Sequence, residues 1–246
     1  MRTVAAMKIG STSTSLLVAE DLSRVLLRRQ RLVNLYAEAG ATELNAVLQE
    51  FTEALNGTGC AVRLAAGGEA VRRQPHLAEL VARRGWPFWE VTGAEEGRVT
   101  WLAVKAALPQ TRWIVDVGGG STEFASETQA YSVPAGAAHQ GVVSWPAQGE
   151  IQNPVIVGGT AQALSTMLRT EHIAAQQVQD VLDNLTAHPE MLNVLDPLRR
   201  KIFPQGLRLI QELFSFYGWT QVTFSSRGFL EGLWLAASGG SRAVAP

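Results

Sequence analysis

Two short segments of the sequence place glycines and hydroxyl side chains directly after an apolar stretch. They are Gly10, Ser11 and Thr12 near the N-terminus, and Gly118, Gly119, Gly120 and Ser121 in the middle of the chain. Because glycine lacks a Cβ, successive backbone N–H groups in such turns can converge on one anion. The two segments therefore predict two turns that hold phosphate groups.

A charged residue precedes each turn by two positions. Asp116 precedes the second turn, where a carboxylate can hold a cation or orient a water molecule. Lys8 takes the corresponding place before the first turn. Two such turns in one chain indicate two similar half-domains that face each other across a cleft.

The turns belong to an order of strands and helices that occurs twice. Strands are predicted at 2–9, 14–20 and 23–31 and, in the second half, at 113–117, 122–126 and 129–133. In each half this meander is followed by helices that alternate with strands. The order predicts an α/β fold of two ribonuclease-H-like domains, 1–110 and 111–246, duplicated as in actin and hexokinase. In such a fold the ligand lies in the interdomain cleft, at the tips of the glycine turns.

Two helices are predicted late in the chain. Thr170 is expected to cap an amphipathic helix. The apolar residues of that helix are Ile173, Val178, Val181, Leu182 and Leu185. Pro204 is expected to start a helix that runs through Phe216, because the first position of a helix tolerates the missing N–H of proline.

The composition is that of a folded protein without a strong net charge. Hydrophobic residues make up 46% of the 246 residues and charged residues 17%. Lys and Arg total 21 against 22 for Asp and Glu, so no overall field attracts DNA or a membrane surface. The single Cys60 excludes an intramolecular disulfide, and no apolar run reaches the roughly 18 residues that span a bilayer. We therefore expect a cytoplasmic protein.

Several segments, spread over the chain, share one pattern with a known family. They are Lys8-Ile9-Gly10-Ser11-Thr12-Ser13, Ala70-Val71-Arg72, Glu95-Glu96-Gly97-Arg98, the turn from Asp116 to Glu123, Ser132-Val133-Pro134-Ala135-Gly136-Ala137, Gly158-Gly159-Thr160-Ala161, and Gly228 to Gly232. In this order they resemble the exopolyphosphatase / guanosine-pentaphosphate phosphohydrolase family. The matches cover nearly the whole two-domain core, so the chain looks like a short, divergent member.

The resemblance implies roles for individual residues. Glu96 matches the carboxylate that activates water as the catalytic base, and Arg72 matches the arginine that grips phosphoryl oxygens. Asp116 matches the acid that binds a divalent metal, expected here to be Mg²⁺, or orients the water. The two glycine turns match the loops that hold the phosphates. The resemblance also implies inorganic polyphosphate or guanosine penta- or tetraphosphate as the ligand, and a homodimer.

The chain departs from the family pattern at Lys8, where the family carries an acid that matters for metal binding. A lysine there repels Mg²⁺ but can place an ammonium near the phosphates. Two predictions stay open: a hydrolase that releases terminal phosphate from phosphoanhydrides, and a relative that binds polyphosphate or a nucleotide without turnover. A third, an ATP-dependent sugar or acyl kinase of the same fold, is disfavoured because no sugar-binding insertion is apparent.

Several charged residues also have purely structural interpretations. Acids such as Glu95 and Glu96 stabilise the first turn of a helix through its dipole, and Glu95 is assigned to solvent. Arg72 fits an exposed basic pair, although a position facing the cleft is favoured. The basic runs 28–31 and 199–201 are typical of solvated faces, with a path for a polyanion as the alternative.

Overall fold

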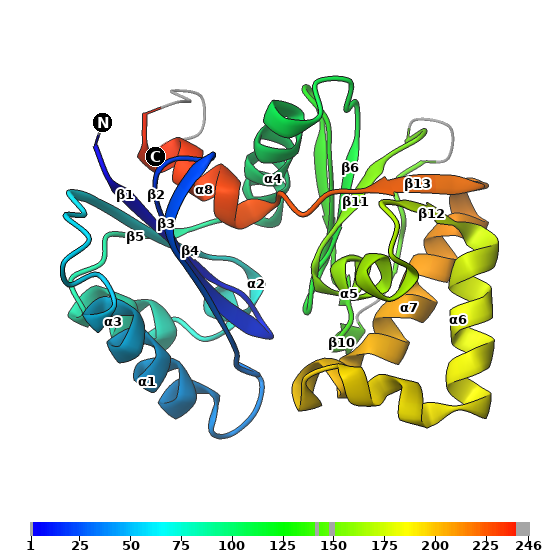
Figure 1. Cartoon of the computed structure of the whole chain (residues 1–246), viewed down its shortest axis with the longest axis horizontal. Helices are drawn as coiled ribbons and strands as arrows, with labels where there is room; N and C mark the ends of the chain where they lie inside the picture. The colour runs from blue at the N-terminus through cyan, green and yellow to red at the C-terminus, as the bar shows by residue number, and fades with distance from the viewer. Residues whose placement is uncertain (1, 141–142, 148–150, 240–246) are drawn as a thin grey trace.

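The computed structural model of the chain describes residues 2–140, 143–147 and 151–239. Its described strands form a five-stranded sheet in the first half, a six-stranded sheet in the second half and a two-stranded ladder. Figure 1 shows the two large sheets next to each other, with helices packed around both. The repeated order of elements in the sequence thus corresponds to two separate sheets.

The first sheet is built on the predicted antiparallel meander. β1 (Val4–Ile9), β2 (Ser13–Asp21) and β3 (Arg24–Leu32) form the meander, and β4 (Val62–Gly67) and β5 (Phe88–Glu90) add parallel strands beside β1. The order across the sheet is β3-β2-β1-β4-β5. β1 lies in the middle and is mostly apolar on both faces, as expected for a strand that is covered on two sides.

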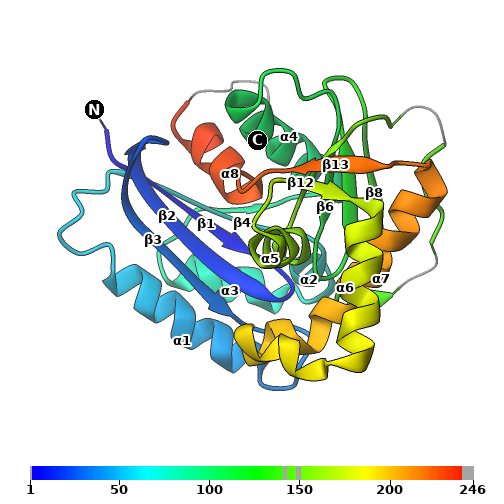
Figure 2. The same cartoon turned by 45° about the vertical axis from the view of Figure 1, so that its right-hand side comes forward.

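Helices cover both faces of this sheet (Figure 2). On one face lie α1 (Gly40–Glu53), α2 (Glu69–Arg73) and α3 (His76–Arg83). On the other face lies α8 (Phe229–Ala237), from the end of the described chain. The first sheet is therefore completed by a helix that the second half of the chain supplies.

Alternation along β1 assigns its side chains to these two layers. Met7 packs with the core under α1 and α3, whereas Val4 and Ala6 pack with α8. Lys8 continues the row of Val4 and Ala6 at the two-residue spacing of a strand. Its side chain therefore enters the α8 side, where Nζ lies 5.4 Å from the centroid of the Phe229 ring.

The second sheet repeats the same plan. β6 (Ile114–Val117), β7 (Thr122–Ala125) and β8 (Ala130–Val133) form its meander, β11 (Val155–Val157) and β13 (Gln221–Phe224) add parallel strands, and β12 (His172–Ala174) lies antiparallel at the edge. The order is β12-β13-β11-β6-β7-β8. β9 (Ala135–Gly136) and β10 (His139–Gln140) form the separate ladder.

The remaining helices of the second half lie on one face of this sheet. They are α5 (Gly159–Leu168), α6 (Ala175–Ala187), the 3₁₀ helix η1 (Pro189–Val194) and α7 (Pro197–Tyr217). The other face is covered by α4 (Gly93–Ala107), which comes from the first half of the chain. Among the described helices, none combines the length and the apolar character required to cross a bilayer.

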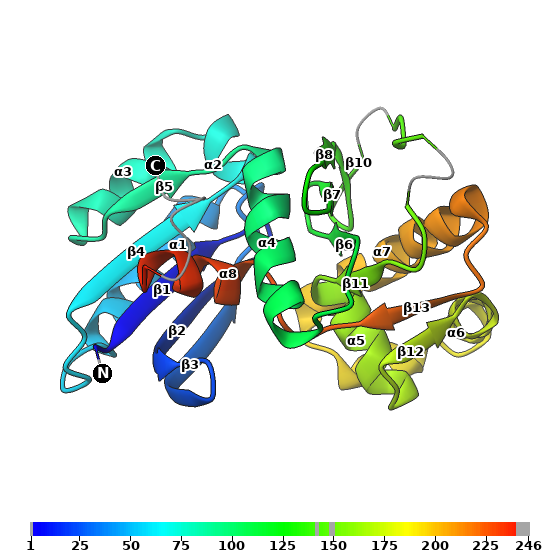
Figure 3. The ribbon, with the colours of Figure 1, turned by 90° about the horizontal axis from the view of Figure 1, so that it is seen from above.

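α4 and α8 join the two halves. In Figure 3 α4 stands between the two sheets, with α8 beside it. The helices cross so closely that a Cβ added at Gly232 of α8 would overlap the carbonyl of Val99 in α4. The division into 1–110 and 111–246 stays a prediction, because the last helix of each half, α4 or α8, packs between the two sheets.

The prediction of a helix that begins after Thr170 is wrong for the first turn. Ile173 lies in β12 and pairs with Val222 of β13, and the helix begins at Ala175. Ile173 is fully buried in β12, and because a helix can also bury an apolar residue, its apolar character does not separate a strand from a helix. The available edge of β13 decides in favour of the strand.

The start of the long helix α7 is also predicted wrongly. It begins at Pro197, and Asp196 caps it by accepting a hydrogen bond of 3.0 Å from Leu198 N. Pro204 lies inside this 21-residue helix. Proline does occupy the first position of α7, as the sequence preference predicts, but the residue there is Pro197 and not Pro204.

Candidate active site

The two glycine turns are closed by the same internal hydrogen bond. Gly10 N donates to the carbonyl of Ser13 over 2.9 Å, and Gly118 N donates to the carbonyl of Ser121 over 3.0 Å. The charged residues two positions before these glycines are Lys8 and Asp116. The duplicated hairpins therefore give Lys8 and Asp116 equivalent positions on β1 and β6.

The tips of the two turns meet. A Cβ added at Gly119 would lie 2.7 Å from Thr12 Cγ2, and one at Gly120 would lie 2.8 Å from Ser11 Oγ. Such approaches are too short for a real Cβ, so side chains at these positions would push the halves apart. The glycines of the second turn are thus required by the close approach of the first turn.

A cavity of about 230 Å³ lies between the halves. Every site residue predicted from the sequence except Arg72 contributes to its lining. They are Lys8, Gly10, Ser11, Thr12, Glu96, Asp116, Gly118, Gly119, Gly120 and Ser121. Residues more than a hundred positions apart in the chain are thus brought to one pocket, as the two-turn hypothesis requires.

Glu96 reaches the cavity from the first turn of α4. Thr92 caps this helix in a capping box with Glu95, whose side chain accepts a 2.6 Å hydrogen bond from Thr92 N. The sequence alone assigns Glu95 to solvent. In the structure its side chain instead caps α4. Glu96, one residue further along, places Oε1 3.7 Å from Lys8 Nζ, and its side chain is 13% exposed.

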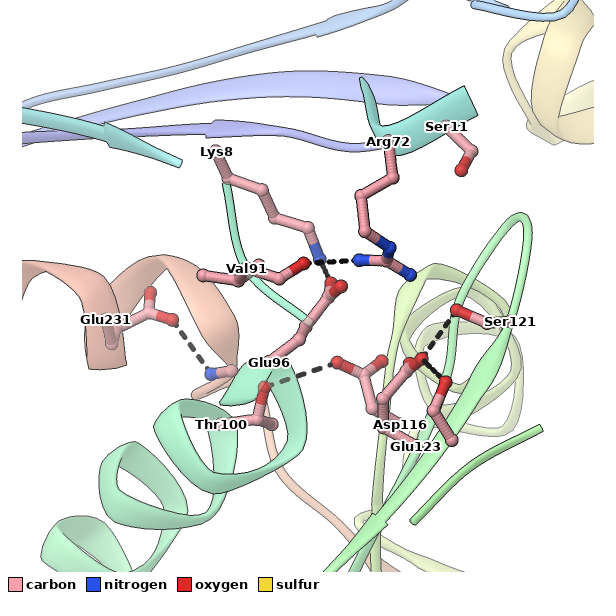
Figure 4. Close-up of polar contacts among 12 residues, drawn as sticks. Lys8, Ser11, Arg72, Val91, Glu96, Thr100, Asp116, Ser121, Glu123 and Glu231 are labelled. Carbon is pink, nitrogen blue, oxygen red and sulfur yellow. Dashed lines mark hydrogen bonds and ion pairs between the residues drawn. The ribbon is translucent and has the colours of Figure 1, made fainter. Parts of the chain in front are cut away.

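Asp116 and Glu123 stand opposite each other on β6 and β7. Glu123 Oε1 accepts hydrogen bonds from Ser121 Oγ at 2.5 Å and from Ser132 Oγ at 2.9 Å. Thr100 Oγ1 lies 3.5 Å from Asp116 Oδ2. Figure 4 shows both carboxylates on the same side of the pocket, across from Lys8.

Arg72 differs from its prediction. Its guanidinium donates a hydrogen bond to the carbonyl of Val91, and Arg72 is absent from the lining of the cavity in the described chain. It nevertheless lies near Glu96, because a Cβ added at Gly68 would touch both side chains. As drawn in Figure 4, Arg72 supports the region around Glu96. Its role as a phosphate ligand stays a prediction.

The charges of the pocket are strongly coupled. Burial alone would lower the pKa of Lys8, but the carboxylates of Asp116, Glu96, Glu123 and Glu231 together raise it above its usual value. Burial raises the pKa of Glu96, although Lys8 acts in the opposite direction. Burial and the neighbouring carboxylates hold the pKa of Glu123 well above that of a free glutamate.

Residues 7–156, more than half of the chain, match the model described as the Ppx/GppA phosphatase family. The chain belongs to the Ppx/GppA phosphatase family. The resemblance seen in its motifs is thereby confirmed.

Solved structures of the Ppx/GppA family have the same fold. The PPX-GPPA enzyme of Aquifex aeolicus is 20% identical, with a TM-score of 0.76 over 96% of this chain and 99% of that chain. An exopolyphosphatase from Cytophaga hutchinsonii is 18% identical, with a TM-score of 0.80 over 97% of this chain and 98% of that chain. These likenesses confirm the predicted duplicated ribonuclease-H-like fold.

The side chains around Asp116 fit poorly to a magnesium ion held by protein carboxylates. Mg²⁺ favours oxygen ligands, but here the ammonium of Lys8 lies among the carboxylates that would have to supply them. Among the described residues, no group of three or more His, Cys, Asp or Glu side chains is arranged to hold a metal ion. Mg²⁺ stays a prediction of the family resemblance, and no step below depends on it.

The cavity lining also includes residues that were not assigned to the site from the sequence, among them Glu123, Arg28 and Arg199. Glu123 lines the cavity beside Asp116, and the pairing of β6 with β7 is the signal that could have found it. Arg28 and Arg199 also line the cavity, so each basic run places at least one residue at the pocket, whereas Lys201 of the second run is exposed outside the lining. Arg199 packs directly on Gly159 at the start of α5, a contact that needs α7 and α5 to be placed first.

Proposed function

We propose that this member of the Ppx/GppA family is a phosphoanhydride hydrolase. Its substrate is inorganic polyphosphate or guanosine pentaphosphate, from which it releases the terminal phosphate. The observation that carries the proposal is the meeting of the two glycine turns at a pocket that also holds Glu96 and Asp116. Family membership supports phosphatase chemistry on phosphate chains in general.

In the proposed reaction the chain supplies positioning and charge. Backbone N–H groups of the two turns hold the phosphate oxygens. A water molecule beside Glu96 attacks the terminal phosphorus, and the bridging P–O bond breaks with its electrons going to the departing chain. Asp116 orients the attacking water molecule, and Glu96 accepts its proton. Burial raises the pKa of Glu96 above that of a free glutamate, which strengthens this carboxylate as a proton acceptor.

The decisive test compares Glu96→Gln with its neighbour Glu95→Gln. Both changes remove one carboxylate from the first turn of α4, but glutamine at 95 keeps the capping box. For Glu96→Gln we expect phosphate release from polyphosphate and from guanosine pentaphosphate to fall by about 10²–10⁴-fold, the usual contribution of a general base. Glu95→Gln should stay within about twofold of the wild type. Equal activity in the two variants would remove Glu96 as the base.

Lys8 favours a second candidate, a protein that binds phosphate chains without hydrolysing them. The ammonium at hydrogen-bonding distance from a phosphate would stabilise the bound anion whether or not water attacks it. Calorimetry with tripolyphosphate distinguishes the two candidates. Tight binding without phosphate release, under every divalent cation supplied, would select the binder.

A further inference from the structure

Lys8 is fixed in the pocket rather than mobile on a surface. Its Cε passes close to the glycine turn, 3.3 Å from the position that a Cβ at Gly10 would take. The Phe229 ring attracts the ammonium from the α8 side. The side chain is 23% exposed, and this exposure opens onto the cavity that Lys8 lines. The ammonium is therefore positioned before any ligand binds.

The carboxylates of the pocket make a cation necessary. Glu96, Asp116 and Glu123 all line the cavity in which a phosphate chain would lie. Like charges repel strongly where burial lowers the effective dielectric constant. An anionic substrate can thus bind beside these groups only when positive charge stands among them.

Three of the other cationic side chains of the lining already have polar partners. Arg28 pairs with Glu231, Arg29 pairs with Glu50, and Arg227 donates to a backbone carbonyl over 3.1 Å. Arg199 packs on the first turn of α5. Of the described lining residues, Lys8 is the cation that lies against Glu96.

We propose that the Lys8 ammonium is the built-in cation of this active site, and that it allows hydrolysis of the phosphoanhydride without a divalent metal ion. The proposal rests on the proposed function. The three N–H donors of the ammonium contact oxygens of the transferred phosphoryl group, where charge gathers in the transition state. Lys8 neither gives up nor accepts a proton in the step, which otherwise proceeds as described above.

The position of Lys8 also disfavours the binding of a metal ion in the pocket. An ion that used Asp116 and Glu96 as ligands would share these carboxylates with the ammonium and be repelled by it. Replacement of Lys8 by an acid should remove this repulsion and favour binding of a metal ion. A carboxylate at position 8 would face Asp116 from the equivalent point of the other hairpin, and the two would form a site for a divalent ion.

The experiment measures phosphate release in excess EDTA and in a titration of Mg²⁺. The wild type should hydrolyse polyphosphate in EDTA, with at most a small gain from Mg²⁺. Lys8→Met should lose about a hundredfold or more in EDTA, the usual effect of removing one group that stabilises transition-state charge. Lys8→Asp should be inactive in EDTA and recover activity as Mg²⁺ is added. Lys201→Met, at an exposed lysine of α7, is the matched control and should behave as the wild type.

Two binding measurements keep the result independent of turnover. Mn²⁺ binding, followed by electron paramagnetic resonance, should be stronger in Lys8→Asp than in the wild type. Calorimetry in EDTA with imidotriphosphate, a non-hydrolysable chain, should show weaker binding to Lys8→Met than to Lys201→Met. Thermal unfolding of each variant checks that it is folded.

The outcomes separate this proposal from the proposed function. Hydrolysis by the wild type that requires a divalent ion, and that Lys8→Met retains, would overturn the role of Lys8 but leave the hydrolase. A lack of hydrolysis under every condition would overturn the hydrolase, and the imidotriphosphate comparison would then decide whether Lys8 holds phosphate. Equal binding by Lys8→Met and Lys201→Met would overturn that role as well.

Discussion

At the scale of single residues, the pocket holds more carboxylates than one cation can balance. Glu123 is 1% exposed and lies beside Asp116, while Ser121 and Ser132 both donate hydrogen bonds to it. These hydrogen bonds favour the ionised form, but burial and the neighbouring acids outweigh them and raise its pKa. The folded protein therefore retains a proton on Glu123 over a pH range in which the unfolded chain has released it.

This difference makes stability depend on pH. As the pH rises above 4.5, the ordinary pKa of the group, the unfolded chain ionises first, so the free energy of unfolding falls until the folded pKa is passed. The slope from this one group is at most about 1.4 kcal/mol per pH unit. Glu123→Gln should remove the contribution, so that its stability exceeds that of the wild type near pH 7 and the two converge below pH 4.5.

Urea unfolding of both proteins across this pH range measures the effect. Glu127→Gln, which changes an exposed acid in the next turn, is the control and should leave the curve of the wild type unaltered. Parallel curves for Glu123→Gln and the wild type would contradict the assignment of the proton to Glu123.

At the scale of elements, the first turn of α4 decides where Glu96 points. Thr92 accepts a 3.2 Å hydrogen bond from Glu95 N, and Glu95 returns one to Thr92 N. This reciprocal cap fixes the residue at which the helix begins. Since successive residues of a helix point in different directions, a shift in the start of α4 would turn Glu96 away from Lys8.

We therefore expect Thr92→Ala to affect both stability and turnover. Loss of the cap should lower the free energy of unfolding by about 1 kcal/mol, within the usual range for threonine caps. Fraying of the turn should also reduce kcat for phosphate release. Thr92→Ser keeps the hydroxyl and should restore both quantities, which chemical denaturation and a phosphate assay measure. An alanine variant with lower stability but unchanged kcat would show that the cap does not position Glu96.

At the scale of the whole molecule, the pocket exists because two halves of similar plan face each other. The glycine turns meet at their tips, and α4 and α8 cross between the sheets. Each sheet is completed by a helix that the other half supplies or shares. The relative position of Lys8 and Asp116 therefore depends on the packing between the halves and not on either hairpin alone.

Gly119→Ala tests this contact. The added methyl group would lie 2.7 Å from Thr12 Cγ2, so we expect the variant to lose about 1–3 kcal/mol of stability through overpacking. Thr12→Ser removes that Cγ2 and should recover part of the loss in the double variant. Unfolding measurements on the single and double variants give the coupling between the two turns. Strictly additive losses would mean that the tips do not meet.

Local patterns in the sequence were sufficient for most elements. The meanders at 4–32 and 114–133 follow from short apolar runs separated by turns, and Glu95 and Glu96 indicated the acidic first turn of α4. The glycine-rich motifs identified the family and the fold, because only glycine suits the close backbone approach at these turns. These features depend on a few neighbouring residues, and a sequence displays them directly.

What the sequence left open depends on contacts between distant segments. Ile173 became a strand because β13 offered an edge, and the part of Glu123 in the pocket followed from its pairing with Asp116. Lys8 on β1 and Glu96 on α4 lie 3.7 Å apart only because these two elements pack together. The sequence by itself determined which chemical groups are present and which turns carry them. The tertiary structure decided which groups share one pocket, because packing of the two halves sets distances that no local pattern encodes.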